Sequence, residues 1–297
     1  MHRRTFIKSA TASTALTWMP FSLVKSETQR VCTLPVRTKI ALNSYSFNRP
    51  LMSGEMTMDD MLDYAAQVGF EGIDLTGYYF PGYPTVPTDD YIYHIKQKAF
   101  HLGLEICGSG VRNDFNYTDQ ASREEAVQLV KNWIEVVSKL GGQTLRVFAG
   151  KDVMPDQRRE DVFQKIVNCI KECAEYGRNH GVVLAIQNHD DFLKTADQVE
   201  ALMKAVESPW VGLMLDIGSY RKADPYLEIK QTIKYAITWQ IKEEVTINGA
   251  ATKTDFHKLK DIIADSTFRG YLPIETLGEG DPKAKIARLI DEIRNFF

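Results

Sequence analysis

From residue 36 onward, short apolar or β-branched runs alternate with longer amphipathic segments. The short runs predict strands and the amphipathic segments predict helices. We expect strands at 38–47, 72–78, 104–110, 144–150, 182–189, 211–219, 236–243 and 271–278. We expect helices at 58–69, 88–102, 122–140, 157–180, 194–206, 225–234, 254–265 and 281–296. Thr57 and Thr88 stand where N-caps of two helices would lie, and Gly141 follows a third helix.

Eight strand–helix units within about 260 residues predict an α/β fold, a (β/α)₈ TIM barrel in a single domain over residues 36–297. The competing architecture is a doubly wound open sheet, which often begins with a glycine-rich turn. The chain has neither a G-x-G-x-x-G motif nor a P-loop, and its "GGQTLR" segment enters a strand instead of leaving one. The pattern therefore favours the barrel.

Composition narrows the classes of partner. The 297 residues are 44% hydrophobic and carry a formal net charge of −3 with both signs mixed along the chain. Nothing in this balance indicates nucleic acid or an anionic membrane as a partner. No apolar run reaches the roughly 20 residues that a membrane span requires.

The N-terminus differs from the rest of the chain. Arg3 and Arg4 are followed by Phe6, Ile7 and Lys8, and then by an apolar stretch rich in Ala, Ser and Thr. This pattern resembles a bacterial twin-arginine export signal, and a basic helical tail is the alternative. We expect residues 1–30 to be a signal segment and the mature protein to be periplasmic.

Polar residues interrupt the predicted strands near their carboxyl ends, where a barrel places its chemistry. Asp216 ends "LMLD" and Glu275 ends "YLPIE". A buried carboxylate is costly unless it faces a cation, hydrogen-bond donors or water. The two residues therefore indicate a site, although Asp216 could instead cap the next helix and Glu275 could pair with Arg146 or Lys242.

The other strand-end groups leave their roles open. His189 could be a hydrogen-bonded structural histidine, and Lys242 could simply neutralise a neighbouring glutamate. Arg112 and Arg146 fit either contacts to an anion or a sugar, or ordinary salt bridges. The candidate substrate-binding residues are Tyr45, Arg112, Asn113, Arg146 and Asn188.

The segments "AIQNH", "LMLDIG", "WQIKEE" and "YLPIETLG" resemble the sugar phosphate isomerase/epimerase family of xylose isomerase-like barrels. In the epimerase branch, Glu, Asp, His and Glu on strands five to eight bind one divalent cation, and the two glutamates transfer protons. The resemblance implies four metal-ligand positions: Gln187, Asp216, Gln240 and Glu275. Here Gln187 replaces a glutamate and Gln240 replaces the histidine, whereas Lys242 keeps the flanking pattern.

These two departures change the expected chemistry. A glutamine carbonyl can ligate Mg²⁺ or Mn²⁺ but adds no charge, and Gln187 cannot act as a base. The expected activity is divalent-metal-assisted proton abstraction on a sugar or keto-sugar, giving isomerisation, epimerisation or β-elimination. Glu275 is the expected base, His189 the acid or a substrate contact, and Lys242 an electrostatic partner.

Other functions remain open at this point. The alternative is a metal-free carbohydrate-binding barrel without catalysis, in which Glu275 pairs with Lys242 or Arg146. A repair endonuclease fits poorly because that chemistry needs a histidine-rich multi-metal site and a basic groove. The expected partner is a small carbohydrate, and the pattern leaves a homo-oligomer open.

Overall fold

Eight parallel strands form one closed sheet in the computed structural model, which describes residues 38–189, 191–221 and 224–297. The strands are β1 (Thr38–Asn43), β2 (Gly72–Thr76), β3 (Glu105–Gly110), β4 (Thr144–Phe148), β5 (Val183–Gln187), β6 (Val211–Asp216), β7 (Ala236–Gln240) and β10 (Gly270–Ile274). Their order is β10-β1-β2-β3-β4-β5-β6-β7. A parallel bridge between Ile241 and Ile274 joins the two outer strands and closes the barrel. The predicted TIM-barrel fold is confirmed.

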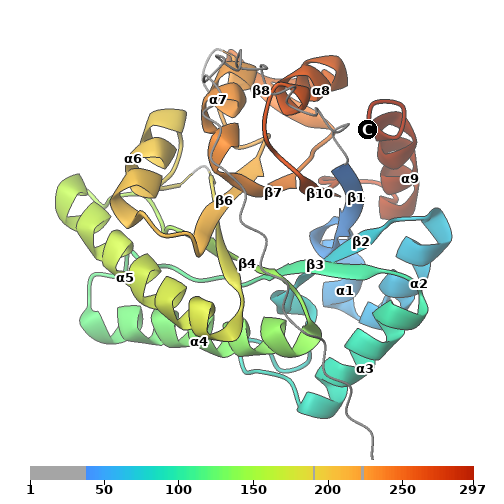
Figure 1. Ribbon diagram of the computed structural model, residues 1–297, viewed down its shortest axis with the longest axis horizontal. Helices are drawn as coiled ribbons and strands as arrows, with labels where there is room; N and C mark the ends of the chain where they lie inside the picture. The colour runs from blue at the N-terminus through green and yellow to red at the C-terminus, as the bar shows by residue number, and fades with distance from the viewer. Residues whose placement is uncertain (1–37, 190, 222–223) are drawn as a thin grey trace, which may run out of the picture. The chain divides into compact units, whose positions relative to one another are not determined.

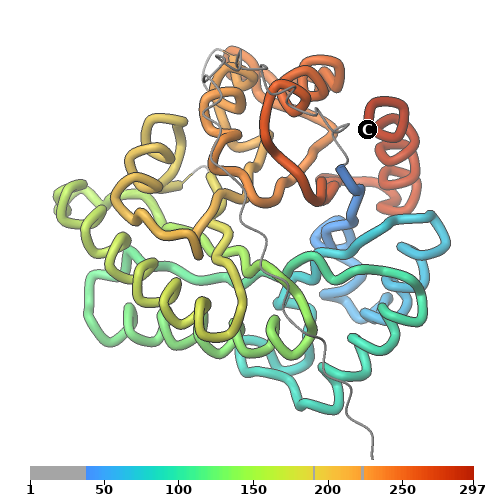
Figure 2. The backbone as a smooth tube through the Cα atoms, in the orientation of Figure 1, coloured from blue at the N-terminus to red at the C-terminus, as the bar shows by residue number. Residues whose placement is uncertain are grey.

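Helices surround this sheet (Figure 1). They are α1 (Asn48–Ser53), α2 (Met58–Val68), α3 (Asp89–His101), α4 (Gln120–Leu140), α5 (Arg159–His180), α6 (Ala196–Val206), α7 (Pro225–Thr232), α8 (Phe256–Ala264) and α9 (Pro282–Ile293). The chain runs once around the ring, so the C-terminal helix α9 lies beside the start of the barrel (Figure 2). The carboxyl ends of all eight strands therefore converge at one end of the barrel.

Local signals set the helix boundaries. The Thr57 side chain accepts from the Asp60 backbone N–H, and the Asp60 carboxylate accepts from the Thr57 N–H, which forms a capping box. Thr88 caps α3 in a similar way through the Tyr91 N–H. At the end of α4, Gly141 adopts φ of +80°, a conformation that favours glycine.

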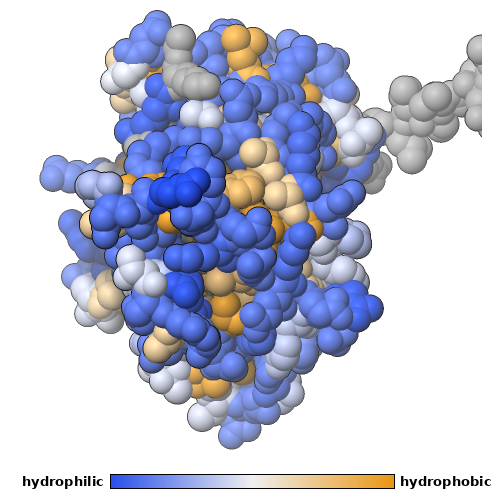
Figure 3. Space-filling model, turned by 90° about the vertical axis from the view of Figure 1, so that its left-hand side faces the viewer, coloured by the Kyte–Doolittle hydropathy of each residue, from blue (hydrophilic) through white to orange (hydrophobic). Residues whose placement is uncertain are grey.

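The apolar faces of the helices pack against the outside of the sheet. Trp133 on α4 is fully buried, and its ring lies 5.5 Å from that of Phe80 at a steep angle. Burial of each such side chain stabilises the fold by about 2 kcal/mol. The side of the barrel shown in Figure 3 is mainly hydrophilic, with apolar residues in small separate groups.

All the strands except β3 stop earlier than the hydrophobic pattern predicts. β1 ends at Asn43 because its side chain accepts from the Tyr45 N–H and the chain enters a 3₁₀ turn, η1 (Ser44–Phe47). The helix α1 was not expected. A hairpin of β8 (Glu244–Ile247) and β9 (Ala250–Lys253) follows β7 and was also not expected.

No helix among the described residues is long and apolar enough to cross a membrane. The expected signal segment at residues 1–30 lies outside the residues that the structure describes.

Candidate functional site

A cavity of about 550 Å³ opens at the carboxyl ends of the barrel strands. Its lining residues are Tyr45, Tyr78, Arg112, Asn113, Asp114, Tyr117, Arg146, Phe148, Gly150, Lys151, Gln187, His189, Asp191, Gln240, Lys242, Glu275 and Leu277. Several of these residues were candidates from the sequence alone, and seven of the eight barrel strands, with the loops that follow them, bring them together. A cavity of this size is typical of a small-molecule site.

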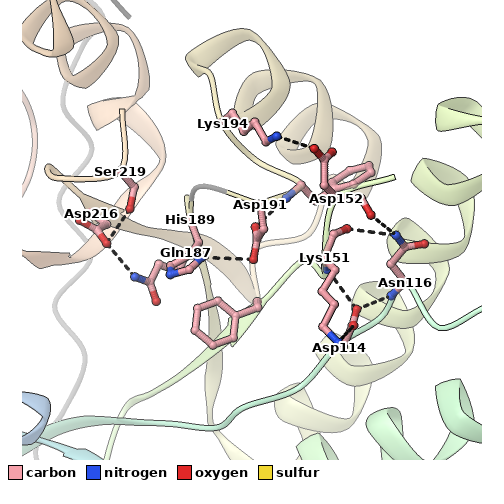
Figure 4. Close-up of polar contacts among 12 residues, drawn as sticks. Asp114, Asn116, Lys151, Asp152, Gln187, His189, Asp191, Lys194, Asp216 and Ser219 are labelled. Atoms are coloured by element: carbon pink, nitrogen blue, oxygen red, sulfur yellow. Dashed lines mark hydrogen bonds and ion pairs between the residues drawn. The ribbon is translucent and has the colours of Figure 1, made fainter. Parts of the chain in front are cut away.

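The four positions at the ends of β5, β6, β7 and β10 form one hydrogen-bonded chain. The Gln187 amide nitrogen donates to Asp216 Oδ2 at 2.9 Å and to Gln240 Oε1 at 2.6 Å. The Gln240 amide nitrogen then donates to Glu275 Oε1 at 3.1 Å. Figure 4 shows the Gln187 amide directed toward Asp216. Both amides therefore present N–H groups to carboxylates.

Asp216 is fully buried, and donors from its own turn hold it in place. Oδ1 accepts from the Gly218 N–H at 2.9 Å, and Oδ2 accepts from the Ser219 hydroxyl at 2.9 Å. Asn188 binds the backbone of the same residue, donating to its carbonyl and accepting from its N–H, each at 2.8 Å. The structure thus places Asn188 in the β5–β6 junction, without exposure to the cavity, although the sequence made it a candidate substrate contact.

The Lys242 ammonium lies between the two carboxylates. Its Nζ is 2.9 Å from Asp216 Oδ2 and 3.2 Å from Glu275 Oε2. Gly218 makes room for this side chain, because a Cβ there would lie 2.7 Å from the Lys242 Cδ. Burial opposes the positive charge of Lys242, but Asp216 and Glu275 outweigh it and raise its pKa, so the side chain stays an ammonium.

Glu275 is 5% exposed and lines the cavity. Burial raises the pKa of this carboxyl group, and the negative Asp216 adds to the rise, whereas Lys242 and Arg146 counteract it. A carboxylate with a raised pKa accepts a proton more readily than an exposed one. Its position and environment therefore suit a general base.

The opposite wall of the cavity carries arginines and aromatic rings. Arg146 on β4 donates to the Val111 carbonyl and, at 2.7 Å, to the Tyr78 hydroxyl. Its guanidinium lies 4.2 Å from the ring centroid of Phe148, and that of Arg112 lies 4.5 Å from the ring centroid of Tyr78. Of the two salt bridges that the sequence left open for Glu275, the structure forms the one with Lys242 and not the one with Arg146.

The remaining candidates also reach the cavity. His189 lies at its edge, where Nδ1 is 3.2 Å from Asp191 Oδ2 and the ring contacts Phe148 edge-on. Figure 4 shows this pair beside Gln187. Asn113 exchanges two hydrogen bonds with the Phe148 backbone, at 2.8 and 2.9 Å, so its side chain fixes the β3 loop to β4.

Sequence reasoning missed the buried carboxylate of Asp74. Asp74 on β2 is buried inside the barrel, where it accepts from the Asn43 amide at 2.8 Å. Burial raises the pKa of Asp74 to about 6, although Arg146 and Asn43 oppose the rise. A carboxylate within an apolar strand was the signal that identified Asp216, and "GIDLT" carries the same signal.

The side chains of Gln187, Asp216, Gln240 and Glu275 at the strand ends are not arranged to bind a divalent cation. Both glutamines present amide N–H groups to the carboxylates, and Lys242 already binds both carboxylates. Two carboxylates and one ammonium give this buried cluster a formal charge of −1, so a dication would leave an uncompensated positive charge there. Within the described ranges, no group of three His, Cys, Asp or Glu residues is placed to hold a metal ion.

Comparison with known proteins identifies the type of barrel. A profile of the family described as xylose isomerase-like TIM barrel matches residues 62–296. No curated protein matches the chain in sequence.

Solved structures agree with this assignment at low identity. Apo 3-keto-D-glucoside 4-epimerase YcjR from E. coli is 13% identical, with a TM-score of 0.71 over 87% of this chain and 100% of its own. D-Psicose 3-epimerase from Clostridium cellulolyticum H10 is 14% identical, with a TM-score of 0.72 over 87% and 99%. The IolI protein, whose structure contains a zinc atom, is 16% identical, with a TM-score of 0.69 over 88% and 99%. These likenesses support the fold.

Proposed function

This chain belongs to the xylose isomerase-like TIM-barrel family, and we propose that it is an enzyme that removes a proton from the carbon beside the carbonyl group of a sugar or keto-sugar. The observation that carries this proposal is the buried pair of Glu275 and Lys242, which both line the cavity. One member can accept a proton and the other can stabilise a negative oxygen. The structural neighbours that act on sugars support the choice of substrate class.

Glu275 acts as the base in this proposal. A carboxylate oxygen takes the proton from the carbon, and the electron pair of the C–H bond forms a carbon–carbon double bond. The carbonyl oxygen then carries the negative charge of an enediolate. The Lys242 ammonium donates to this oxygen, because it is the positive group nearest to Glu275 and remains protonated.

The outcome depends on where the proton returns or which bond breaks next. Return to the neighbouring carbon gives isomerisation, and loss of a substituent on the β carbon gives elimination. Epimerisation requires a second group on the other face of the substrate, and Gln187 cannot transfer a proton. His189 lines the same cavity and is the residue that would protonate a leaving oxygen.

The proposal does without the divalent metal that the family resemblance implies. Lys242 supplies the positive charge beside the two carboxylates, and the amide N–H groups of Gln187 and Gln240 complete their hydrogen bonds. The two glutamines then have a common explanation: each neutral amide donates to a carboxylate where the family ligand would bind metal.

Proton exchange with solvent tests the proposal directly. The protein is incubated in D₂O with ketoses and 3-keto-glucosides, and ¹H NMR follows the loss of the C–H signal beside the carbonyl. We expect Glu275→Gln to slow exchange by about 10² to 10⁴-fold, the usual contribution of a general base. Glu105→Gln, on β3 at the opposite end of the barrel, is the matched control and should leave the rate unchanged.

A non-catalytic binding barrel predicts another pattern. Sugar binding would then occur without exchange for any keto-sugar, and Glu275→Gln would change only stability. That result would overturn the proposed activity.

We also propose export to the periplasm, on the strength of the Arg3–Arg4 pattern and the apolar stretch that follows. Fractionation of cells that express the full chain tests this. Replacement of both arginines by lysine should retain the protein in the cytoplasm.

A further inference from the structure

The β3–β4 side of the cavity carries a buried positive charge with no adjacent counter-ion. Arg146 is 5% exposed, and its hydrogen bonds go to the Val111 carbonyl and the Tyr78 hydroxyl, which are both neutral. Among the described residues, no carboxylate lies within salt-bridge distance of its guanidinium. Burial of an unpaired charge is costly, so this group requires an anion or a functional reason.

The guanidinium is held in a fixed position. Both guanidinium groups lie near the Tyr78 ring, with the guanidinium carbons of Arg112 and Arg146 at 4.5 and 5.4 Å from its centroid. Gly110 packs closely against the guanidinium, because a Cβ there would lie 2.8 Å from Arg146 Nε. Two of the five Arg146 N–H groups donate to protein oxygens, and the guanidinium lines the cavity. This arrangement is preorganised to bind two oxygens of a carboxylate or phosphate.

The charges divide the cavity into two sides. On the β3–β4 side, Arg112, Arg146 and Lys151 face one carboxylate, Asp114, whose Oδ2 is 3.8 Å from the Lys151 Nζ. On the other side, the single positive charge of Lys242 faces the two carboxylates of Asp216 and Glu275, so this side is negative. A ligand that matches both sides has an anionic group at one end and neutral hydroxyl and carbonyl groups at the other.

Asp74 is a buried carboxylate that could neutralise Arg146 and so make an anionic ligand unnecessary. It lies in the same interior and is influenced by Arg146, but its carboxylate hydrogen bonds to Asn43 and forms no ion pair with the arginine. Arg112 lines the cavity, is exposed and has no carboxylate partner among the described residues. One internal carboxylate therefore leaves this side positive.

We propose that Arg146 and Arg112 bind an anionic group of the substrate, so that the preferred ligand is an acidic sugar: a sugar carboxylate or a sugar phosphate. This inference rests on the proposed function in that the same cavity holds the reacting sugar. The arginines fix the charged end of the substrate, and Glu275 and Lys242 meet the carbonyl end.

Calorimetric titration with matched sugars tests the inference without requiring turnover. D-Glucose, D-glucuronate and D-glucose 6-phosphate share one ring and differ in the group at C6. We expect the full-length protein to bind one or both acidic sugars at least about tenfold more tightly than glucose, with affinity that falls as salt rises. The two acidic ligands distinguish a carboxylate site from a phosphate site. Equal affinity for all three would overturn the inference.

Two variants locate the effect. Arg146→Met should weaken binding of the acidic sugar by about tenfold or more and leave glucose binding within about twofold. Gly110→Ala displaces the guanidinium without removing its charge and should produce the same selective loss, which covers the case in which Arg146→Met does not fold. Arg178→Met, on the exposed surface of α5, is the control. Unchanged selectivity in Gly110→Ala and Arg146→Met would overturn the assignment.

Failure of this inference differs from failure of the proposed function. Deuterium exchange into neutral keto-sugars without any preference for acidic ligands would leave the activity standing and remove the anion site. Selective binding of acidic sugars without exchange into any keto-sugar, acidic or neutral, would leave the anion site standing and remove the activity.

Discussion

The Lys242 ammonium lies 3.2 Å from Glu275 Oε2 at the base of the cavity, and each side chain is almost enclosed by protein. This pair joins a carboxylate that can take a proton to a cation that can stabilise the resulting oxygen charge. Asp216 lies 2.9 Å from the same ammonium and holds it in place. The site thus contains its own positive charge where the family resemblance implies a metal ion.

Removal of Lys242 should lower both the free energy of unfolding and the rate of proton exchange. Lys242→Met leaves Asp216 and Glu275 buried without their cation, and we expect the free energy of unfolding to fall by about 3 to 5 kcal/mol. Urea denaturation measures this loss. The double variant Lys242→Met/Glu275→Met should recover part of the stability, because it removes one of the stranded charges. A strictly additive loss would show that the two residues are not coupled.

Restoring the family ligands should create a metal site. Gln187→Glu and Gln240→His together give Glu, Asp, His and Glu at the four strand ends, with one more negative charge. We expect Mn²⁺ to raise the melting temperature of the double variant by several degrees and that of the parent chain by less than one, because binding to the folded state stabilises it. Gln198→Glu, on the surface helix α6, controls for added charge. Equal Mn²⁺ stabilisation of all three proteins would contradict the conclusion that the parent residues do not fit a divalent cation.

Asp74 should make stability depend on pH between about 4 and 6. Its folded-state pKa of about 6 exceeds its ordinary value of 3.8, so the folded protein holds this proton more tightly than the unfolded chain does. The stabilisation is complete below pH 3.8 and is lost as pH rises through 6, with a total change of about 3 kcal/mol. Asp74→Asn lacks this proton.

The measurement is the difference in unfolding free energy between the parent chain and Asp74→Asn. The parent chain should lose stability relative to Asp74→Asn as pH rises from 4 to 6, and the difference should then stay level. A difference that does not change with pH would show that Asp74 titrates normally in the folded state.

The barrel was predictable from sequence because its signals are local. Apolar runs of strand length alternate with amphipathic segments, and Thr57, Thr88 and Gly141 mark helix ends. The β8–β9 hairpin was missed although "NG" is a strong hairpin signal: Asn248 and Gly249 adopt φ of 50° and 80°, as such a turn requires. Residues 244–253 lie between the predicted strand at 236–243 and the predicted helix at 254–265, and neither prediction included them.

The site was only partly predictable because its chemistry depends on side-chain direction. The family resemblance implied Gln187, Asp216, Gln240 and Glu275 as a set, and their spacing is consistent with the ends of consecutive βα units. The folded chain decides which atoms of the glutamine amides face the carboxylates. It also decides that Lys242 reaches both carboxylates. The buried position of Asn188 is likewise visible only in three dimensions.

The most direct test of metal-free proton abstraction is deuterium exchange after exhaustive treatment with a chelator. The protein is stripped with EDTA, transferred to D₂O and incubated with a 3-keto-glucoside or a ketose that the parent chain binds, while ¹H NMR follows the proton beside the carbonyl. We predict exchange at the same rate before and after chelation, and a rate about 10² to 10⁴-fold lower in Glu275→Gln. Loss of exchange after chelation and its return with Mn²⁺ would contradict the account.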